Sequence, residues 1–600
     1  MRVADYIFKY LADYGIEYVF LVTGGGAMHL NDALKRESRI KYFCNYHEQG
    51  AAIAAEGYAR TKGSLAVVTV SSGPAVTNAL TGVIGQWLDS VPVLYLSGQV
   101  KYETTTASDS DISLRQLGDQ EINVINMVNG VTKYAKMITE PESIKQELDI
   151  AVNSATSGRP GPVWLDIPLN VQGALINELN LNSNKIKNSI LTVKDATILK
   201  VINEIQKAKR PVLVAGHGIR IAKAEKKLLK LVDLLNIPVL STFNGFDLIS
   251  SQSDNFIGRI GTLGSRAGNF ALQNTDLAIF LGTRNNIRQV SYDWISYARN
   301  AKKIIVDIDY AELHKKTIKG DILIQSDAKV FISKLSEMIP KSFSVNKIWK
   351  EWCLVRKKKY PVVLDEYKIP NQHSVNPYYF IEKLTTILND DAVVVAANGS
   401  ACVVLFQAGK VKFGQRFIWN SGCASMGYAL PASIGASLAV NREVICITGD
   451  GSIQMNLQEL QAIKHHNLPI KIFVLNNDGY SSIKLTQTQF FSGNFIGCNE
   501  ASGISFPDNS KLAELYNLKY YKIDSSTKMA GVIKKILSYS GAVLCEVMLV
   551  KNYAIAPKLT SEKKPDGSIV SKPLEDLYPF LERDEFRSNM IINDKNEEDV

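Results

Sequence analysis

The sequence lacks the features that would place it in several common non-enzymatic classes. No apolar run approaches the roughly 20 residues that a membrane-spanning helix needs, and the N-terminus has no signal-peptide core or cleavage site. The seven cysteines include no Cys-x-x-Cys pair, which indicates scattered thiols in a reducing compartment. No basic block with interleaved aromatic residues accompanies the formal net charge of +9. We therefore expect a cytoplasmic protein with neither a membrane nor a nucleic-acid partner.

What the sequence does contain is a repeated alternation of helix and strand. A chain of 600 residues is too long for one hydrophobic core, and the alternation divides it into segments of similar plan. We expect an α/β fold with three doubly wound parallel-sheet domains, at residues 1–180, 190–340 and 360–555. The polar stretch between the first two is predicted to be a linker. Residues 556–600 form a tail rich in proline and charge, which is either an ordered arm or partly mobile.

The stretch from Gly449 to Asn477 carries the clearest chemical signal. The runs EVICIT and IKIFVL read as strands, and MNLQELQAIKHH between them has the apolar spacing of a helix. Such a βαβ unit makes the two strands parallel, with a right-handed crossover. Asp450 and Asn477 then lie at the carboxyl ends of these strands, the edge at which open α/β sheets bind ligands.

These residues suit a magnesium ion that holds a diphosphate. Mg²⁺ prefers oxygen ligands, some from the protein and the rest from phosphates and water. Asp450 offers a carboxylate oxygen, Asn477 an amide oxygen and Gly479 a backbone carbonyl. Gly449 and Gly451 allow the backbone to approach a diphosphate closely. An Asp-Gly turn without a ligand would explain the first motif alone, but the Asn pair after the next strand favours the metal–diphosphate interpretation.

A Gly-Asp-Gly motif followed by Asn-Asn resembles the signature of the thiamine diphosphate-dependent enzymes. The stretches NYHEQGAAIAAEGYAR, SSGPAVTNALTGV, GRPGPVWLDIPLNV and GCASMGYALPASIGA also resemble segments of that family. The likeness covers residues 1–555 and is strongest toward the acetolactate synthase-like (acetohydroxyacid synthase) branch. It implies thiamine diphosphate and Mg²⁺ as cofactors.

The resemblance assigns activation of the cofactor to Glu48. In the family, a glutamate hydrogen-bonds to the aminopyrimidine ring, whose amino group then removes the weakly acidic proton of the thiazolium ring. Met426 matches the bulky residue that keeps the cofactor bent, and the carbonyl of Ala424 matches the acceptor for the amino group. In isolation Glu48 reads as a charge in a helix first turn and Met426 as a core residue. Together with the metal motif, they favour a cofactor site.

The resemblance also implies cofactor contacts at five further positions: Gly399, Ser400, Ser452, Tyr480 and Ser481. The first two lie in a segment that departs from the family, since Ala-Asn-Gly-Ser-Ala stands where Asp-Val-Gly-Gln-His is usual. The middle domain binds FAD in the synthases, and Arg284 matches a position that would meet the flavin diphosphate. In many relatives this domain is empty or holds another nucleotide, so all three outcomes stay open.

On the substrate side, the resemblance implies catalytic-site positions at Gly25, Gly26 and Gln120. Gly25 and Gly26 belong to the loop TGGGAMHL, which would line the substrate side, and Gln120 matches a glutamine of the acyl site. His47 either hydrogen-bonds at the mouth of the site or orients the loop that carries Glu48.

Departures from the synthases fall on the acceptor side. Thr486 stands where the synthases carry a tryptophan that gates the acceptor, and Ile287 replaces the aspartate that precedes the substrate-side arginine, here Arg288. These changes predict an acceptor larger than pyruvate or 2-ketobutyrate, such as a 4-keto sugar nucleotide.

The implied activity is that of an acetolactate synthase-like transferase. A 2-keto acid, usually pyruvate, loses CO₂, and the resulting hydroxyalkyl carbanion is ligated to a carbonyl acceptor. The alternative is a 2-keto acid decarboxylase or another thiamine diphosphate lyase without ligation. A non-catalytic binding subunit should lack Glu48, Asp450 or Asn477, and all three are present. The resemblance further implies that Glu48 and Asp450 act across a subunit interface, so a homodimer is the minimum assembly and a tetramer is common.

Overall fold

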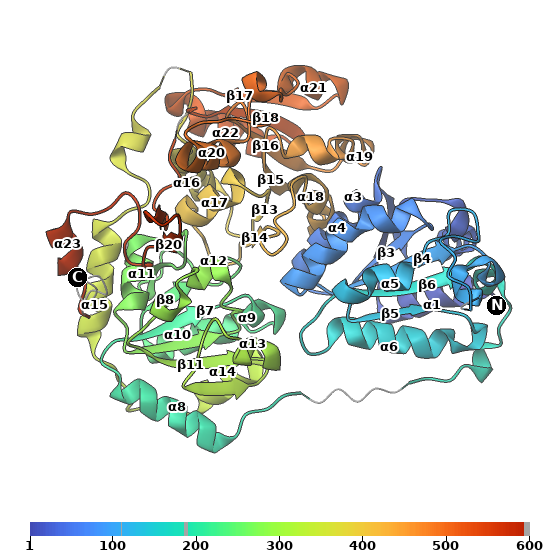
Figure 1. Cartoon of the computed structure of the whole chain (residues 1–600), viewed down its shortest axis with the longest axis horizontal. Coiled ribbons are helices and arrows are strands. Elements are labelled where there is room, and N and C mark those ends of the chain that lie inside the picture. The colour runs from blue at the N-terminus through green and yellow to red at the C-terminus, as the bar shows by residue number, and fades with distance from the viewer. Residues whose placement is uncertain (110, 185–189, 372, 552, 593–600) are drawn as a thin grey trace.

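The computed structural model describes residues 1–600 except 110, 185–189, 372, 552 and 593–600. The described residues form three six-stranded parallel sheets and one two-stranded antiparallel hairpin. Helices cover both faces of each large sheet (Figure 1). This confirms the predicted α/β fold class with three doubly wound domains. Part of the predicted linker and the end of the predicted tail lie outside the described residues.

The N-terminal domain is built on strands β1–β6, in the spatial order β2-β1-β3-β4-β6-β5. The strand bounds are β1 Tyr18–Leu21, β2 Lys41–Cys44, β3 Ala66–Val70, β4 Val93–Gln99, β5 Tyr134–Met137 and β6 Val163–Pro168. The helix bounds are α1 Val3–Tyr14, α2 Met28–Arg36, α3 Glu48–Lys62, α4 Pro74–Asp89, α5 Val124–Val128, α6 Ile144–Thr156 and α7 Leu169–Gly173. The strand order reverses between β1 and β3, so the loops that follow these two strands meet at the carboxyl edge.

The central domain repeats the plan with β7–β12, in the order β12-β11-β10-β7-β8-β9. The strand bounds are β7 Pro211–Ala215, β8 Val239–Ser241, β9 Phe256–Arg259, β10 Leu277–Leu281, β11 Lys302–Asp307 and β12 Ile322–Gln325. The helix bounds are α8 Asp195–Lys207, α9 Gly218–Ile221, α10 Glu225–Leu235, α11 Arg266–Gln273, α12 Ile287–Val290, α13 Tyr310–His314, α14 Ala328–Met338 and α15 Lys347–Lys359. Four of these six strands, β7, β8, β10 and β11, are predicted from the sequence, each with the loop that follows it. The two further strands, β9 and β12, are short edge strands.

The C-terminal domain holds β13–β18, in the order β14-β13-β15-β16-β18-β17. The strand bounds are β13 Val393–Ala396, β14 Arg416–Ile418, β15 Val444–Gly449, β16 Ile470–Asn476, β17 Lys519–Ile523 and β18 Val543–Met548. The helix bounds are α16 Pro377–Ile387, α17 Ser400–Ala408, α18 Ala429–Val440, α19 Glu459–His465, α20 Ser481–Phe491, α21 Asn509–Leu515 and α22 Ser526–Ser538. β15 and β16 are adjacent and parallel, so the predicted βαβ unit is confirmed. The switch point lies between β13 and β15, and Asp450 follows β15 there.

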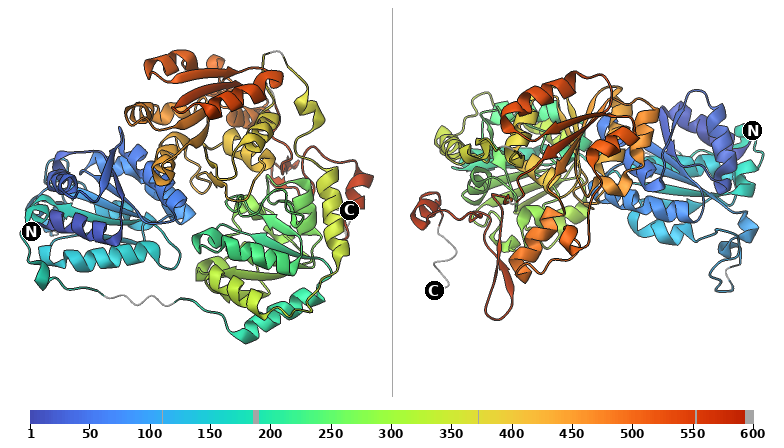
Figure 2. Two further views of the ribbon diagram at one scale, coloured as in Figure 1. Left: turned by 180° about the vertical axis from the view of Figure 1, so that it is seen from behind. Right: turned by 90° about the horizontal axis from the view of Figure 1, so that it is seen from above.

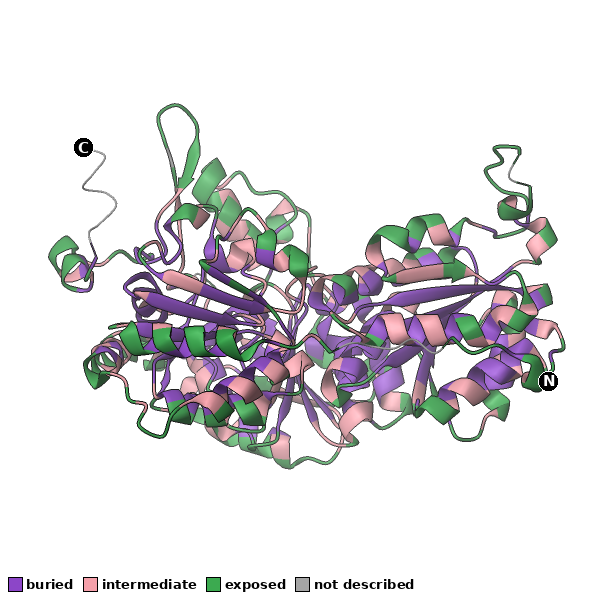
Figure 3. Ribbon diagram, turned by 90° about the horizontal axis from the view of Figure 1, so that it is seen from below, coloured by how far each residue is buried: buried purple, intermediate pink, exposed green. Residues whose placement is uncertain are grey.

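The N-terminal and C-terminal domains share one hydrophobic core, because α3 lies directly on α18. The two helices approach at glycines: a Cβ on Gly57 would lie 2.1 Å from the carbonyl oxygen of Ala432, and a Cβ on Gly435 would lie 1.8 Å from that of Ala54. Figure 3 shows the strands buried and the outer helix faces exposed. No helix among the described residues combines the length and apolar character needed to cross a membrane.

Over its described part, the C-terminal tail forms an arm that packs on the central domain. After a protruding hairpin formed by β19 (Ser561–Lys563) and β20 (Ile569–Ser571), it runs back over the central domain to α23 (Arg583–Ser588) (Figure 2). The buried carboxylate of Glu575 accepts hydrogen bonds from Arg299 at 2.7 Å and from Gln273 at 2.6 Å. These buried charge-assisted contacts hold the arm on the central domain.

Candidate functional site

The carboxylate of Asp450 organises the carboxyl edge between β15 and β16. Its Oδ2 accepts hydrogen bonds from the backbone N–H groups of Asn477 at 3.0 Å, Asp478 at 2.9 Å and Gly479 at 3.3 Å. Its Oδ1 accepts from the N–H of Gly451 at 2.8 Å. Burial raises the pKa of Asp450 to about 6, against the opposing effect of these hydrogen bonds. The structure thus brings the predicted metal-binding residues together.

Asn477 presents an oxygen without a partner at this edge. Its Nδ2 donates to Ser481 Oγ at 3.1 Å, which directs Oδ1 the other way. That Oδ1 is buried and has no hydrogen-bond partner among the described residues. A buried carbonyl oxygen without a donor is costly, and a cation would satisfy it. Carboxylate and amide oxygens are a suitable donor set for Mg²⁺, so these residues fit the ion that the sequence predicts.

The glycines of the two motifs make room around this edge. A Cβ on Gly451 would lie 2.0 Å from the Tyr480 ring, and a Cβ on Gly479, whose φ is 145°, would lie 2.2 Å from the carbonyl oxygen of Cys498. Both positions therefore require glycine. Gly449 instead has open space where a Cβ would point, which leaves room for a ligand beside the strand end.

Two helices begin beside Asn477. Gly399, with φ 71°, precedes α17, which starts at Ser400, and α20 starts at Ser481. The hydroxyl groups of these two serines lie 3.0 Å apart. The free N–H groups at helix N-termini favour anions, and the unpartnered oxygen of Asn477 lies next to them. The predicted positions Ser400 and Ser481 therefore lie together with the predicted metal residues.

Tyr553 belongs to this cluster and is missed by the sequence analysis. Its side chain is buried, and its hydroxyl makes no hydrogen bond of good geometry among the described residues. Burial raises its pKa, while Ser400, Ser481 and Asn477 near the hydroxyl oppose that rise. The residue follows β18 in a stretch without a recognisable motif, so no signal in the sequence could have identified it.

The loop between β14 and α18 carries Ala424 and Met426 and is tied to the metal motif. Ala424 has φ 56°, a left-handed conformation that is strained for a residue other than glycine. The N–H of Gly427 donates to Ser452 Oγ at 3.0 Å. Asn398 donates from Nδ2 to the carbonyl of Ser425 at 2.7 Å. The unusual 397–401 segment thereby fixes the same loop from the other side.

The predicted residues of the N-terminal domain form a second group at their own sheet edge. The N–H of Gly26 donates to Ser71 Oγ at 3.2 Å, and Gln120 has its backbone against Gly73, where a Cβ would lie 2.6 Å from the Gln120 carbonyl oxygen. The loops after β1 and β3 thus meet, as the topology requires, with Gln120 beside them. Gly25 opens the short 3₁₀ turn Gly25–Ala27 in the first of these loops.

Glu48 is the first residue of α3, and its Oε2 accepts from Asn78 Nδ2 at 3.0 Å. His47 caps this helix, since its Nδ1 accepts from the N–H of Gln49 at 3.1 Å, so it contributes to the orientation of the Glu48 turn. Among the described residues, Glu48 has no hydrogen bond to the loop of Ala424 and Met426. Within one chain the two predicted groups are therefore not joined at Glu48.

A cavity of about 610 Å³ lies where the three domains meet. It is lined by the β7 and β10 loops of the central domain, by Asp89 and Arg159 of the N-terminal domain and by Ser421 of the C-terminal domain. Arg284, the predicted diphosphate contact, lines it as well and lies 4.0 Å from Asp89 Oδ1. Arg159 is already paired with Asp309 at 2.8 Å and Glu312 at 2.9 Å. The walls thus combine cationic and polar groups.

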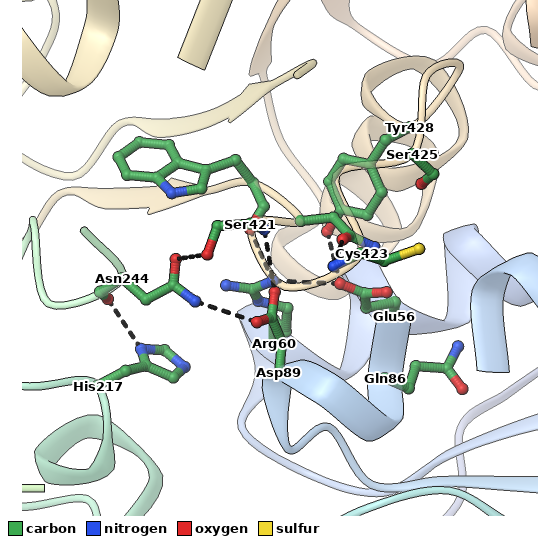
Figure 4. A network of polar contacts seen from close by, with 12 residues as sticks. Glu56, Arg60, Gln86, Asp89, His217, Asn244, Ser421, Cys423, Ser425 and Tyr428 are labelled. Atoms are coloured by element: carbon green, nitrogen blue, oxygen red, sulfur yellow. Dashed lines mark hydrogen bonds and ion pairs between the residues drawn. The ribbon is translucent and has the colours of Figure 1, made fainter. Parts of the chain in front are cut away.

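A buried polar network connects this cavity to the Ala424 loop (Figure 4). Asn244 donates to Asp89 Oδ1 at 3.2 Å and accepts from the hydroxyl of Ser421 at 2.9 Å. Further inside, Arg60 pairs with Asp89 at 3.5 Å and with Glu56 at 3.1 Å. Burial raises the pKa of Glu56 to about 7. A ligand in the cavity would therefore border groups that also hold the loop.

Three family models of the thiamine pyrophosphate (thiamine diphosphate) enzymes match this chain. They are the N-terminal TPP binding domain over residues 1–127, the central domain over 198–335 and the C-terminal TPP binding domain over 397–547. The central match spans all six strands of its sheet, whereas the N-terminal match ends before β5 and the C-terminal match begins just after β13.

Several relatives resemble the chain over nearly its whole length. An acetolactate synthase large subunit from Lactococcus lactis subsp. lactis (strain IL1403) is 32% identical over 94% of this chain and 95% of the relative. A probable acetolactate synthase large subunit from Methanococcus aeolicus is 30% identical over 99% and 100%. Acetolactate synthase 2, chloroplastic, from Nicotiana tabacum is 29% identical over 93% and 83%. The chain therefore belongs to the thiamine pyrophosphate enzyme family. Within that family it is similar to the acetolactate synthase large subunits.

We expect metal binding at Asp450 to depend on pH in a defined direction. The carboxylate binds Mg²⁺ only when deprotonated, and its raised pKa of about 6 places protonation just below neutrality. The affinity for Mg²⁺ with thiamine diphosphate should thus be full above pH 7 and fall about tenfold per pH unit below 6. Calorimetric titration at several pH values measures this.

Asp450→Asn should weaken Mg²⁺-dependent binding by about 100-fold or more. Asp478→Asn is the matched control, because that carboxylate is exposed and pairs with Lys551 at 3.0 Å. Unchanged binding in Asp450→Asn would contradict the assignment.

Proposed function

We propose that the protein binds thiamine diphosphate and Mg²⁺, decarboxylates a 2-keto acid such as pyruvate, and ligates the resulting unit to a carbonyl acceptor. The observation that carries this is the Asp450–Asn477 edge, with its buried, unpartnered amide oxygen beside two helix N-termini. Family membership and the names of the relatives support the reaction type. The seven cysteines are free thiols, which supports a reducing location such as the cytoplasm.

Different residues of the chain would bind the metal ion, the diphosphate and the aminopyrimidine ring. Asp450, Asn477 and the Gly479 carbonyl would hold the metal ion, and Ser400 and Ser481 would contact the diphosphate. When bound, the cofactor supplies the electron sink for the loss of CO₂. Glu48 would donate and accept a proton at the aminopyrimidine ring. Met426 would keep the cofactor bent, while the Ala424 carbonyl accepts from the ring amino group.

We further propose that a homodimer is the minimum functional unit. In one chain, the only described side-chain partner of Glu48 is Asn78 of its own domain. The helix α20, which starts at the cofactor edge, has no buried residue and exposes Ile483, Phe490 and Phe491. A second copy would supply Glu48 to the Asp450 edge of the first and cover such apolar surface.

Complementation between two inactive variants tests this assembly. Glu48→Gln alone should retain cofactor binding but lose activity by at least about 10²-fold, and Asp450→Asn should lose binding. A co-expressed mixture should regain activity, because a heterodimer contains one site with both native residues. No recovery in a heterodimer isolated with two affinity tags would contradict a shared site.

For the acceptor, we propose a ketone larger than pyruvate, such as a 4-keto sugar nucleotide. Thr486, at the position of the synthase tryptophan, lies on the exposed helix α20. The guanidinium of Arg288 stacks over the ring of Phe243, 4.8 Å from its centroid, at the wall of the cavity. The small side chain of Thr486 on α20 would leave space for a large acceptor, whereas a bulky residue there would limit the size of the acceptor.

Product analysis by mass spectrometry tests the acceptor. Pyruvate with a 4-keto sugar nucleotide should give a ligated product with two added carbons, and Thr486→Trp should reduce that product more than acetolactate. Acetolactate as the sole efficient product, with keto-sugar nucleotides inert, would end the acceptor proposal. Free acetaldehyde alone would instead favour a decarboxylase without ligation.

We propose that the central cavity binds a nucleotide, with FAD as the occupant that the family resemblance suggests. Its volume of about 610 Å³, the loops at the switch point between β7 and β10, and the guanidinium of Arg284 support a phosphate-bearing ligand. The purified protein should show flavin absorption bands, and Arg284→Gln should release flavin more readily on dialysis. A colourless protein that does not take up FAD in a fluorescence titration would contradict FAD.

A further inference from the structure

The turn that precedes Glu48 is held by a carboxylate from another domain. Glu459, the first residue of α19, is fully buried. Its Oε2 accepts from Asn45 Nδ2 at 2.8 Å, and its Oε1 accepts from the backbone N–H of Tyr46 at 3.1 Å. Tyr46 is followed directly by the capping residue His47 and then by Glu48. The contact therefore acts on the backbone from which the proposed activating side chain projects.

The residues around Glu459 leave room for its contact with the turn before Glu48. A Cβ on Gly50, in the first turn of α3, would lie 2.4 Å from Glu459 Oε1, so only glycine leaves room for the carboxylate. The ring of Phe43 in β2 packs on that of His466, which directly follows α19, with centroids 4.4 Å apart. Strand β2, the turn and helix α3 of the N-terminal domain thus all meet α19.

A role in packing alone accounts poorly for a carboxylate here. Burial raises the pKa of Glu459 to about 7, which shows that the charged form is desolvated. The two domains are already joined by the apolar core and by the glycine contacts of α3 and α18. A carboxylate differs from an apolar residue in that it fixes specific donors, and both donors belong to the turn before Glu48.

We propose that Glu459 is a positioning residue that fixes the Glu48 turn so that the Glu48 carboxyl group meets the aminopyrimidine ring. This rests on the proposed function, in which Glu48 activates the cofactor. The Glu48 side chain is held by Asn78 and its backbone by Glu459. Loss of the backbone anchor displaces the carboxyl group, and a shift of about 1 Å in a catalytic group costs about 10²-fold in rate.

The experiment measures a step that needs no substrate. Holoenzyme is placed in D₂O with thiamine diphosphate and Mg²⁺ and quenched in acid, and exchange of the thiazolium C2 proton is followed by NMR. Glu459→Ala should slow exchange by about 10²-fold. The Kd for the cofactor, measured by calorimetry, should stay near the wild-type value, because Glu459 contacts neither the metal residues nor the two serines.

A conservative variant should rescue the exchange rate. The Oδ1 of Asn45 is buried without a partner. In Glu459→Gln the new Oε1 keeps the Tyr46 bond, while its Nε2 donates to that Asn45 oxygen after the Asn45 amide rotates. Near-wild-type exchange in Glu459→Gln beside slow exchange in Glu459→Ala shows that the contacts, rather than the charge, position Glu48. Should Glu459→Ala fail to fold, Asn45→Ala and Gly50→Ala disturb the same contact from the other side.

Glu575→Ala is the matched control, because it removes a buried carboxylate that joins the tail to the central domain, far along the chain from this turn. It should lower the melting temperature without slowing exchange. Equal exchange in wild type and Glu459→Ala, or equal slowing in Glu575→Ala, overturns the positioning role alone. If the wild type binds the cofactor without any exchange, the proposed function falls and the positioning role falls with it.

Discussion

The structure of the candidate site depends on one buried carboxylate that bridges two strand ends. Asp450 accepts four backbone hydrogen bonds, three of them from the turn after β16. These bonds fix the turn and leave the Asn477 oxygen without a partner. Burial imposes a desolvation cost on the Asp450 carboxylate and on the Asn477 oxygen. A divalent ion bound between them would offset that cost.

The domain arrangement extends this constraint to the N-terminal domain. Glycines at the crossing of α3 and α18 let two backbones approach closely, so the relative position of the two domains is closely defined. The continuous segment from Asp450 to Glu459 begins at the proposed metal edge and ends at the turn before Glu48. In the proposed homodimer these two ends serve different sites, because Glu48 acts on the partner's cofactor. One short segment would then connect the two sites.

The parts that the sequence predicts are those with a local signal. β15 and β16 are predominantly apolar runs, and Asp450 and Asn477 directly follow them, so topology alone places them together. The edge strand β12 is missed because it is short, with only three consecutive apolar residues before Gln325. Tyr553 is missed because only tertiary packing brings it to Ser400 and Ser481. Glu459 gives no signal because its partners lie in another domain.

Of the departures from the synthases, Thr486 and Ile287 are not buried, whereas Ala397 and Ala401 lie in the core. Ala424 sits in a strained left-handed conformation but is held by Asn420, whose carbonyl and side-chain oxygens both accept from its N–H at 3.1 Å. The strain, of the order of 1–2 kcal/mol, is therefore compensated on the cofactor side. Helix α20, by contrast, begins at Ser481 in the cofactor edge and buries none of its residues. A change such as Thr486 on this helix disturbs no packing in the chain, so it leaves the proposed cofactor residues in place.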